Sequence, residues 1–375
     1  MKRIPVALII ALGAGVAINA ATSAFAQEEN AYPEIEAEVI IDMLSEQGIR
    51  SDDMDGEHNN TVLEAEAGVE VLLTEHFSIE GVVLLEPVKD PDAGESNVFE
   101  DEGVLVEELA VKYENGPWEA YGGKINPGFN VSLADKVRGI WAEDFSDEYE
   151  INEKIGVGGS YTYESGRFGT HSLGASTFFA DTTFLSGSLG TSRGRTSRSD
   201  GGVSNTQDFS SYLVLLEGQL PETEYEFFRN KPYYKLGYRR LAAGDADGGS
   251  DDEQGRIVTL GDNLVADVTS RLEADIMFEF TYIRDFENSG NDNRYYTVGL
   301  VNTFDKKWSL AAAYTARNIS VPGDSDINDH LLQLTGGYAF GNGVLLEAGW
   351  RSTEEDGIDN DIIGMRLRYS FTSAN

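Results

Sequence analysis

Apolar and polar residues alternate along almost the whole chain after residue 30, and this period of two limits the fold more than any other feature. Between residues 272 and 282 the even-numbered positions are Leu, Ala, Ile, Phe, Phe and Tyr, whereas Glu273, Asp275 and Glu279 stand between them. Such a pattern is typical of β-strands with one apolar face and one wet face. Because 41 Gly and only 9 Pro accompany these runs, the sequence predicts an all-β chain.

The alternating runs predict sixteen strands. A strand tilted across a bilayer needs about 9–11 residues, whereas strands of globular proteins centre on about 5–6 residues. Most of the runs have the membrane-spanning length. They cover residues 34–43, 61–73, 77–86, 104–113, 117–125, 150–163, 169–180, 208–220, 232–243, 256–264, 271–283, 294–304, 307–317, 330–340, 343–352 and 361–371.

The connections between these strands are sorted by length. Those after the even-numbered runs are mostly short, such as 74–76 and 305–306. Those after the odd-numbered runs are long and polar, and they cover 44–60, 87–103, 126–149, 181–207, 244–255, 284–293, 318–329 and 353–360. Outer-membrane barrels show this alternation of short periplasmic turns and long extracellular loops, whereas a soluble β-sandwich has no physical reason for it. We therefore expect a 16-stranded antiparallel transmembrane β-barrel over residues 27–375.

Residues 1–26 have the pattern of a secretory signal peptide. Lys2 and Arg3 precede an apolar stretch, and Ala24-Phe25-Ala26 supplies the small residues of a cleavage site. An uncleaved membrane anchor is the alternative, but the apolar stretch is short for one. We therefore expect the chain to be exported.

Composition and motifs remove several function classes. The chain has 28 Lys and Arg against 65 Asp and Glu, a net charge of −37, whereas nucleic-acid binding needs a basic face. The absence of cysteine excludes disulfides, thiolate metal sites and thiol catalysis. The four His residues have no G-x-S-x-G, Walker or H-E-x-x-H motif beside them. We predict no enzymatic activity, no cofactor, no metal site and no nucleic-acid partner.

Aromatic residues gather where the strands meet the short turns. Such rings sit well at the boundary between lipid headgroups and acyl chains, where barrels carry an aromatic girdle. The residues that predict this girdle are Tyr113, Trp118, Tyr163, Phe168, Phe304, Trp308, Phe340 and Phe371.

Two stretches resemble a known group of proteins. The segment Gly123-Lys124-Ile125-Asn126-Pro127-Gly128-Phe129 is similar to the G-K-x-x-P-x-[FG] segment of porins of the phosphate-selective O and P type, and DFSDEYEINEKIG, from Asp144 to Gly156, continues the likeness. The last strand alternates up to Phe371, much like the C-terminal signal read by the barrel-assembly machinery. The resemblance implies a Gram-negative outer-membrane porin, general or substrate-biased. It also implies a homotrimer surrounded by outer-membrane lipid and lipopolysaccharide.

A barrel of sixteen strands is too wide for its own side chains to fill, so it leaves an aqueous channel unless a loop plugs it. The resemblance implies that the connection 126–149 folds inward and sets the pore width, whereas the residues alone fit an ordinary surface loop equally well. Ile140 and Trp141 are candidate wall anchors. The candidate constriction residues are Lys136, Arg138, Glu143, Asp144, Asp147 and Glu148.

Charges predicted to face the lumen are unevenly distributed along the chain. The early strands supply acids and the later strands supply bases, in particular Glu36, Glu38, Glu64, Glu66, Lys154, Lys235, Arg239, Arg366 and Arg368. Opposed walls of this kind create a transverse field that favours small polar solutes. Alternatively, because the last strand must pair with the first, Arg366 and Arg368 form cross-strand ion pairs with Glu36 and Glu38.

The sequence therefore predicts a channel for passive diffusion of small hydrophilic solutes or ions. Acids outnumber bases at the mouths, which favours cations, whereas the family resemblance implies anions. The alternative function is a plugged structural or adhesive barrel that binds a partner through its outer loops.

Overall fold

The computed structural model describes residues 32–373 except 54–57, 90–93, 131–135, 137–138, 143, 249 and 268–270. The predicted signal peptide, 1–26, lies outside the described residues. Sixteen long strands form the described part of the chain: β1 (Glu34–Ser51), β2 (Asn59–Leu72), β3 (Phe77–Pro87), β5 (Glu102–Asn115), β6 (Trp118–Ile125), β7 (Lys154–Ser165), β8 (Gly169–Ala180), β10 (Ser211–Gln219), β12 (Arg229–Leu241), β13 (Glu253–Asp267), β14 (Arg271–Arg284), β15 (Asp292–Phe304), β16 (Trp308–Ser320), β17 (Ile327–Ala339), β18 (Val344–Glu355) and β19 (Ile358–Thr372). Three two-residue strands accompany them: β4 (Asn97–Val98), β9 (Leu189–Gly190) and β11 (Thr223–Glu224).

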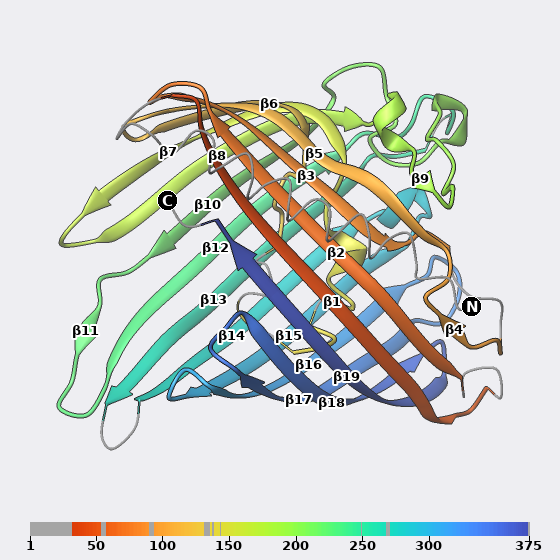
Figure 1. Cartoon of the computed structure of the whole chain (residues 1–375). Helices are drawn as coiled ribbons and strands as arrows, with labels where there is room; N and C mark the ends of the chain where they lie inside the picture. The colour runs from red at the N-terminus through yellow and green to blue at the C-terminus, as the bar shows by residue number, and fades with distance from the viewer. Residues whose placement is uncertain are drawn as a thin grey trace, which may run out of the picture.

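The strands close into a barrel because the last one pairs with the first. β1 is hydrogen-bonded to β2 on one side and to β19 on the other, so that Ile41 lies opposite both Ala65 and Tyr369. Figure 1 shows the red β1 directly beside the blue β19. All long strands pair antiparallel with their neighbours, which confirms the predicted 16-stranded antiparallel barrel.

The period of two places apolar side chains outside and polar ones inside. In β14, Ile276 and Phe278 are exposed on the outer face, whereas Met277 and Glu279 are buried on the inner face. An outward apolar band and a polar interior are what a strand needs when lipid lies on one side and water on the other. Within the described residues, no helix is long and apolar enough to cross a membrane.

Aromatic rings pair at one end of the barrel, which we call the turn end. It carries the connections 73–76, 116–117, 166–168, 305–307 and 340–343, and the opposite end is the loop end. At the turn end the ring centroids of Trp118 and Tyr161 lie 4.6 Å apart, and those of Trp308 and Tyr338 lie 4.5 Å apart. These contacts match the predicted girdle.

The main differences from the predicted strands lie at the loop end. The predicted loop 353–360 is a two-residue turn, in which Asp356 and Gly357 have φ values of 51° and 79°. Positive φ at both positions is typical of the type I′ turns that join hairpin strands. β1 also continues to Ser51, whereas the strand predicted at 150–163 begins at Lys154. The loop-end connections after β14 are short and cover 285–291, 321–326 and 356–357.

Candidate channel and constriction

We call the connection between β6 and β7, residues 126–153, the inner loop, and its described residues lie inside the barrel. Its apolar side chains Phe129, Phe145 and Tyr149 are buried against the inner faces of strands on the β8–β17 side of the wall, for example Ile257 and Tyr295. Burying apolar area of this kind is the main driving force that holds a loop against a wall. Half of the barrel interior therefore has a packed core.

Two bases predicted to face the lumen hold the first part of the inner loop. Lys235 Nζ donates to the carbonyl oxygen of Asn130 at 2.6 Å. The Arg239 guanidinium lies 4.7 Å from the centroid of the Phe129 ring and pairs with Glu253 at 2.6 Å. Lys235 and Arg239 thus act on the inner loop and do not form an open basic wall.

The middle of the inner loop rests on β17, β18 and β19. The backbone N–H of Trp141 donates to Gln333 Oε1 at 3.2 Å, and its indole N–H donates to Glu46 of β1. The indole ring covers two glycines, because a Cβ atom at Gly364 or Gly349 would lie 2.6 or 2.9 Å from it. Trp141 is therefore the wall anchor that its sequence position predicted.

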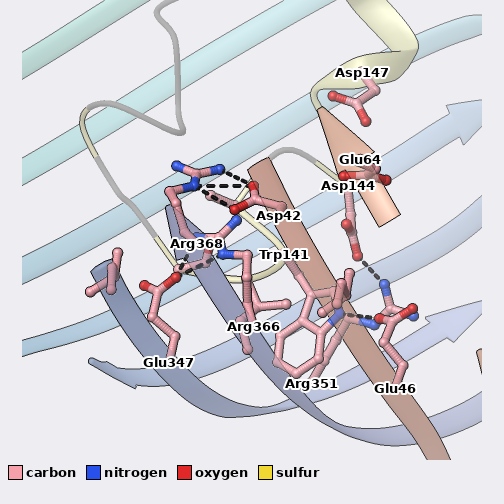
Figure 2. A pocket seen from close by; sticks show the side chains of 15 residues that line it. Asp42, Glu46, Glu64, Trp141, Asp144, Asp147, Glu347, Arg351, Arg366 and Arg368 are labelled. Carbon is pink, nitrogen blue, oxygen red and sulfur yellow. Dashed lines mark hydrogen bonds and ion pairs between the residues drawn. The ribbon is translucent and has the colours of Figure 1, made fainter. Parts of the chain in front are cut away.

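The last part of the inner loop is held by ion pairs. Asp144 pairs with Arg351 (Figure 2), and Glu148 pairs with Arg317 and also accepts a hydrogen bond of 2.6 Å from the Tyr295 hydroxyl. Burial raises the pKa of both carboxyls above the usual range, although the two guanidinium groups oppose this. Partly buried carboxylates of this kind are stabilised by a paired cation, so these ion pairs fix the inner loop to the wall.

The other candidate constriction residues are placed as follows. Lys136 lies over the ring of Tyr233, with Nζ 4.9 Å from the ring centroid. Asp147 is exposed and lines the same cavity as Asp144. Arg138 and Glu143 lie outside the described residues. A constriction made by these side chains stays a prediction.

The two arginines of the last strand have other partners than expected. Arg368 pairs with Asp42 at 2.5 Å, and Arg366 pairs with Glu347 at 2.6 Å (Figure 2). The predicted pairs with Glu36 and Glu38 are wrong because the register places Glu38 opposite Thr372, near the end of β19. Arg368 nevertheless bridges the seam between the first and last strands.

Most of the described bases around the inner loop are thus paired with neighbouring carboxylates. Lys154, the first residue of β7, makes no ion pair with a described residue. The paired bases are Lys124, Lys235, Arg239, Arg317, Arg351, Arg366 and Arg368.

On the other side of the barrel Glu80 pairs with Lys112 at 3.2 Å, but a group of other carboxylates has no such ion pair. Among the described residues, no base lies within ion-pair distance of a group of glutamates on β2, β3 and β5, which we call the acidic wall: Glu64, Glu66, Glu70, Glu86, Glu107 and Glu108. A bulge between Val82 and Val83 leaves Glu107 without an opposite residue. Glu107 accepts a hydrogen bond from Asn126 at 2.8 Å, and Glu108 lines a cavity of about 270 Å³ together with Glu36 and Glu38. The two consecutive glutamates therefore both add charge to this wall.

Small residues line the wall next to these glutamates. A groove of about 300 Å³ on the inner side of β7 and β8 is bordered by Ser160, Thr162, Gly174 and Ser176, and the ring of Tyr121 forms its edge. A larger cavity of about 590 Å³ is lined by Asp144 and Trp141 of the inner loop, by Glu64 and by the arginines of β18 and β19 (Figure 2). Space inside the barrel thus lies beside the acidic wall, whereas the opposite half is packed.

Several residues that contact the inner loop were not among the candidate site residues predicted from the sequence. Glu46, Glu279, Tyr295 and Gln333 contact the inner loop from strands far away in the sequence. Their inward direction follows from the period of two, but their partners depend on the path of the inner loop. That path is set by three-dimensional packing, which the alternation does not encode.

The chain is similar to three solved outer-membrane proteins. OmpF of Salmonella typhi has 13% identity and a TM-score of 0.60, covering 92% of this chain and 99% of that one. The outer-membrane channel DcaP of Acinetobacter baumannii has 12% identity and a TM-score of 0.51, with the same coverage. The trimer form of OmpT of Vibrio cholerae has 11% identity and a TM-score of 0.50, covering 91% and 100%. The sequence matches no protein-family model and no curated protein.

At these identities the likeness shows the fold alone. It is the fold of Gram-negative outer-membrane porins. The likeness does not single out the phosphate-selective type. The absence of enzymatic activity stays a prediction.

Proposed function

We propose that the protein is a porin that lets small hydrophilic solutes and ions diffuse passively across the outer membrane, with a preference for cations. The acidic wall carries the proposal. Among the described residues no ion pair joins its glutamates to a base, whereas Lys235 and the arginines that face the inner loop are each paired with an acid. A lumen with uncompensated negative charge concentrates cations and repels anions.

The inner loop is the proposed constriction. It is tied to the wall through Asn130, Trp141, Asp144 and Glu148, so its position does not depend on a flexible tether. The solute would pass between this loop and the acidic wall. Lys136, Arg138, Glu143 and Asp147 are the remaining charged residues proposed to border that passage.

The phosphate-selective resemblance would imply the opposite selectivity. Phosphate recognition needs accessible cationic or hydrogen-bond donor groups, but Arg351, Arg366 and Arg368 each already hold a carboxylate. We therefore favour cations over phosphate. We also propose a homotrimer, because the similar OmpT has been obtained in a trimer form.

Liposome swelling tests the channel directly. Proteoliposomes that contain the purified protein should swell in isotonic solutions of small neutral sugars, at rates that fall as the sugar becomes larger. Stepwise ion conductance in planar bilayers should accompany the swelling. A barrel that inserts and folds but shows neither property would instead be the plugged structural or adhesive form.

A further inference from the structure

The connection between β10 and β12 is unlike the others described at the turn end. Residues 220–228, which we call the turn-end hairpin, contain β11 and join strands that elsewhere are linked by tight turns such as 166–168 and 305–307. Figure 1 shows β11 at the margin of the barrel, continuing outward from β10 and β12. The tip closes with a hydrogen bond of 2.8 Å from Tyr225 N to Phe228 O. The turn-end hairpin is therefore longer than a turn that only joins two neighbouring strands.

The hairpin exposes large apolar side chains. Tyr225 is 55% exposed and Phe227 is 66% exposed, and the rings of Tyr225 and Phe228 stack with centroids 4.6 Å apart. Together with Val265 they line a groove of about 450 Å³. Exposed apolar patches beside a groove are typical of interaction sites.

One edge of β11 has no neighbouring strand. β11 pairs with β12 through Thr223 opposite Asn230 and Glu224 opposite Arg229. On the other side, β8 follows β10 only as far as Gln219, which lies opposite Thr170. Among the described residues, no strand pairs with the second edge of β11. An open edge presents backbone donors and acceptors to which another extended chain can add.

The charge of the hairpin indicates what kind of chain fits. Glu222, Glu224 and Glu226 alternate with Thr223, Tyr225 and Phe227 along the segment. One base is close by, Arg229, at 3.8 Å from Glu222. An added strand places its alternate side chains beside those of β11. Lysine or arginine alternating with apolar residues therefore complements this edge.

We propose that the turn-end hairpin is a docking site for an extended basic and apolar segment of a periplasmic protein, which adds as a strand to the free edge of β11. A second copy of the same hairpin fits poorly, because it would bring three more glutamates against the first three. An anionic lipid surface is repelled by the same charges. The site is independent of the channel interior, so solute diffusion does not depend on it.

A pair of synthetic peptides tests the proposal with the full chain in detergent. The probe is a fluorescent ten-residue peptide of alternating lysine and valine, and its counterpart has glutamate in place of lysine. The fluorescence anisotropy of the lysine peptide should rise when the protein is added, because the peptide binds. The anisotropy of the glutamate peptide should not change. N-methylation of alternate backbone nitrogens of the lysine peptide should weaken binding at least tenfold, because it removes the donors that strand addition requires.

Substitutions test whether the peptide binds to the turn-end hairpin itself. The triple change Glu222→Gln, Glu224→Gln, Glu226→Gln and the single change Phe227→Ser should each weaken the lysine peptide at least tenfold. The matched controls are Phe168→Ser and Glu164→Gln at the neighbouring turn, where Phe168 is 55% exposed but β7 and β8 pair with each other up to the turn. These controls should leave binding unchanged, and all variants should keep the conductance of the parent.

Several outcomes would overturn the proposal. One is that the lysine peptide does not bind. Another is that the N-methylated peptide binds as tightly as the lysine peptide, or that the triple variant binds the lysine peptide as tightly as the parent does. Self-association that Phe227→Ser abolishes would assign the hairpin to a second copy. Because the chain has no cysteine, Phe227→Cys can be labelled alone. Protection of that thiol from a water-soluble maleimide in phosphatidylglycerol vesicles, but not in detergent, would assign the hairpin to lipid.

Discussion

Single residues decide how the inner loop sits in the barrel. Trp141 fits against the wall because positions 349 and 364 are glycines, and Asp144 and Glu148 are held because Arg351 and Arg317 lie beneath them. Contacts of this kind are sensitive to one added methyl group or one lost charge, since packed interiors have little free volume.

Gly364→Val should push the Trp141 indole off the wall. A Cβ atom there would lie 2.6 Å from the ring, and such overpacking costs about 1–3 kcal/mol of unfolding free energy. Gly336→Val is the matched control, because Gly336 in β17 has open space around it and valine suits a strand. Denaturant unfolding in lipid should show the loss for Gly364→Val alone. Equal stability of the two variants would mean that Trp141 does not rest on Gly364.

Arg317→Met should be one of the more damaging single changes in the barrel. It leaves Glu148 and the buried Asp329 without their base, and breaking a buried ion pair on one side costs about 3–5 kcal/mol. Arg50→Met removes a comparable pair with Asp359, but both of those side chains are about half exposed. Its unfolding free energy should therefore change by about 0–1 kcal/mol. Similar losses for both variants would contradict the buried network.

At the scale of elements, the strands were more predictable than their connections. β8 matches its predicted range, 169–180, because an alternating run ends at clear turn residues on both sides. The loop predicted at 353–360 is wrong because Asp356-Gly357, a strong hairpin signal, joins β18 and β19 in a two-residue turn. The seam pairs were also wrong, since the alternation fixes which face a residue occupies but leaves the register between distant strands undefined.

Gly357→Ala should weaken the β18–β19 hairpin. Gly357 has a φ of 79°, a left-handed conformation that costs residues with a Cβ about 1–2 kcal/mol. Gly166→Ala at the turn after β7 is the control. Gly166 does not have a positive φ, and there is open space around it. Thermal unfolding should begin at a lower temperature only for Gly357→Ala. An unchanged transition would mean that the two-residue turn is not formed.

At the scale of the molecule, the barrel is divided into two halves. The inner loop packs against β8 to β19 and is also hydrogen-bonded to Glu46 of β1 and Glu107 of β5, whereas the acidic wall lines the half formed by β2, β3 and β5. The uneven distribution of acids and bases was visible in the sequence. The neutralisation of the bases was not, because it depends on which carboxylate each arginine meets across the lumen.

Acidification should reduce the preference for cations. Carboxyl groups take up protons at pH values of about 4 to 5, whereas arginine stays charged throughout this range. As the pH falls from 7 to 4, the lumen loses negative charge and keeps its positive charge, so the ratio of cation to anion permeability should fall towards or below one. Bilayer recordings under a fixed salt gradient measure this ratio. A ratio independent of pH would exclude carboxylates as its source.

The reversal potential in a gradient of potassium chloride tests the central claim most directly. The parent protein should give a reversal potential with the sign expected of a channel that is more permeable to potassium than to chloride. The triple variant Glu66→Gln, Glu107→Gln, Glu108→Gln should bring that potential closer to zero while the channel still conducts. A potential of the sign set by chloride in the parent, or the same potential in parent and variant, would contradict an acidic wall that selects cations.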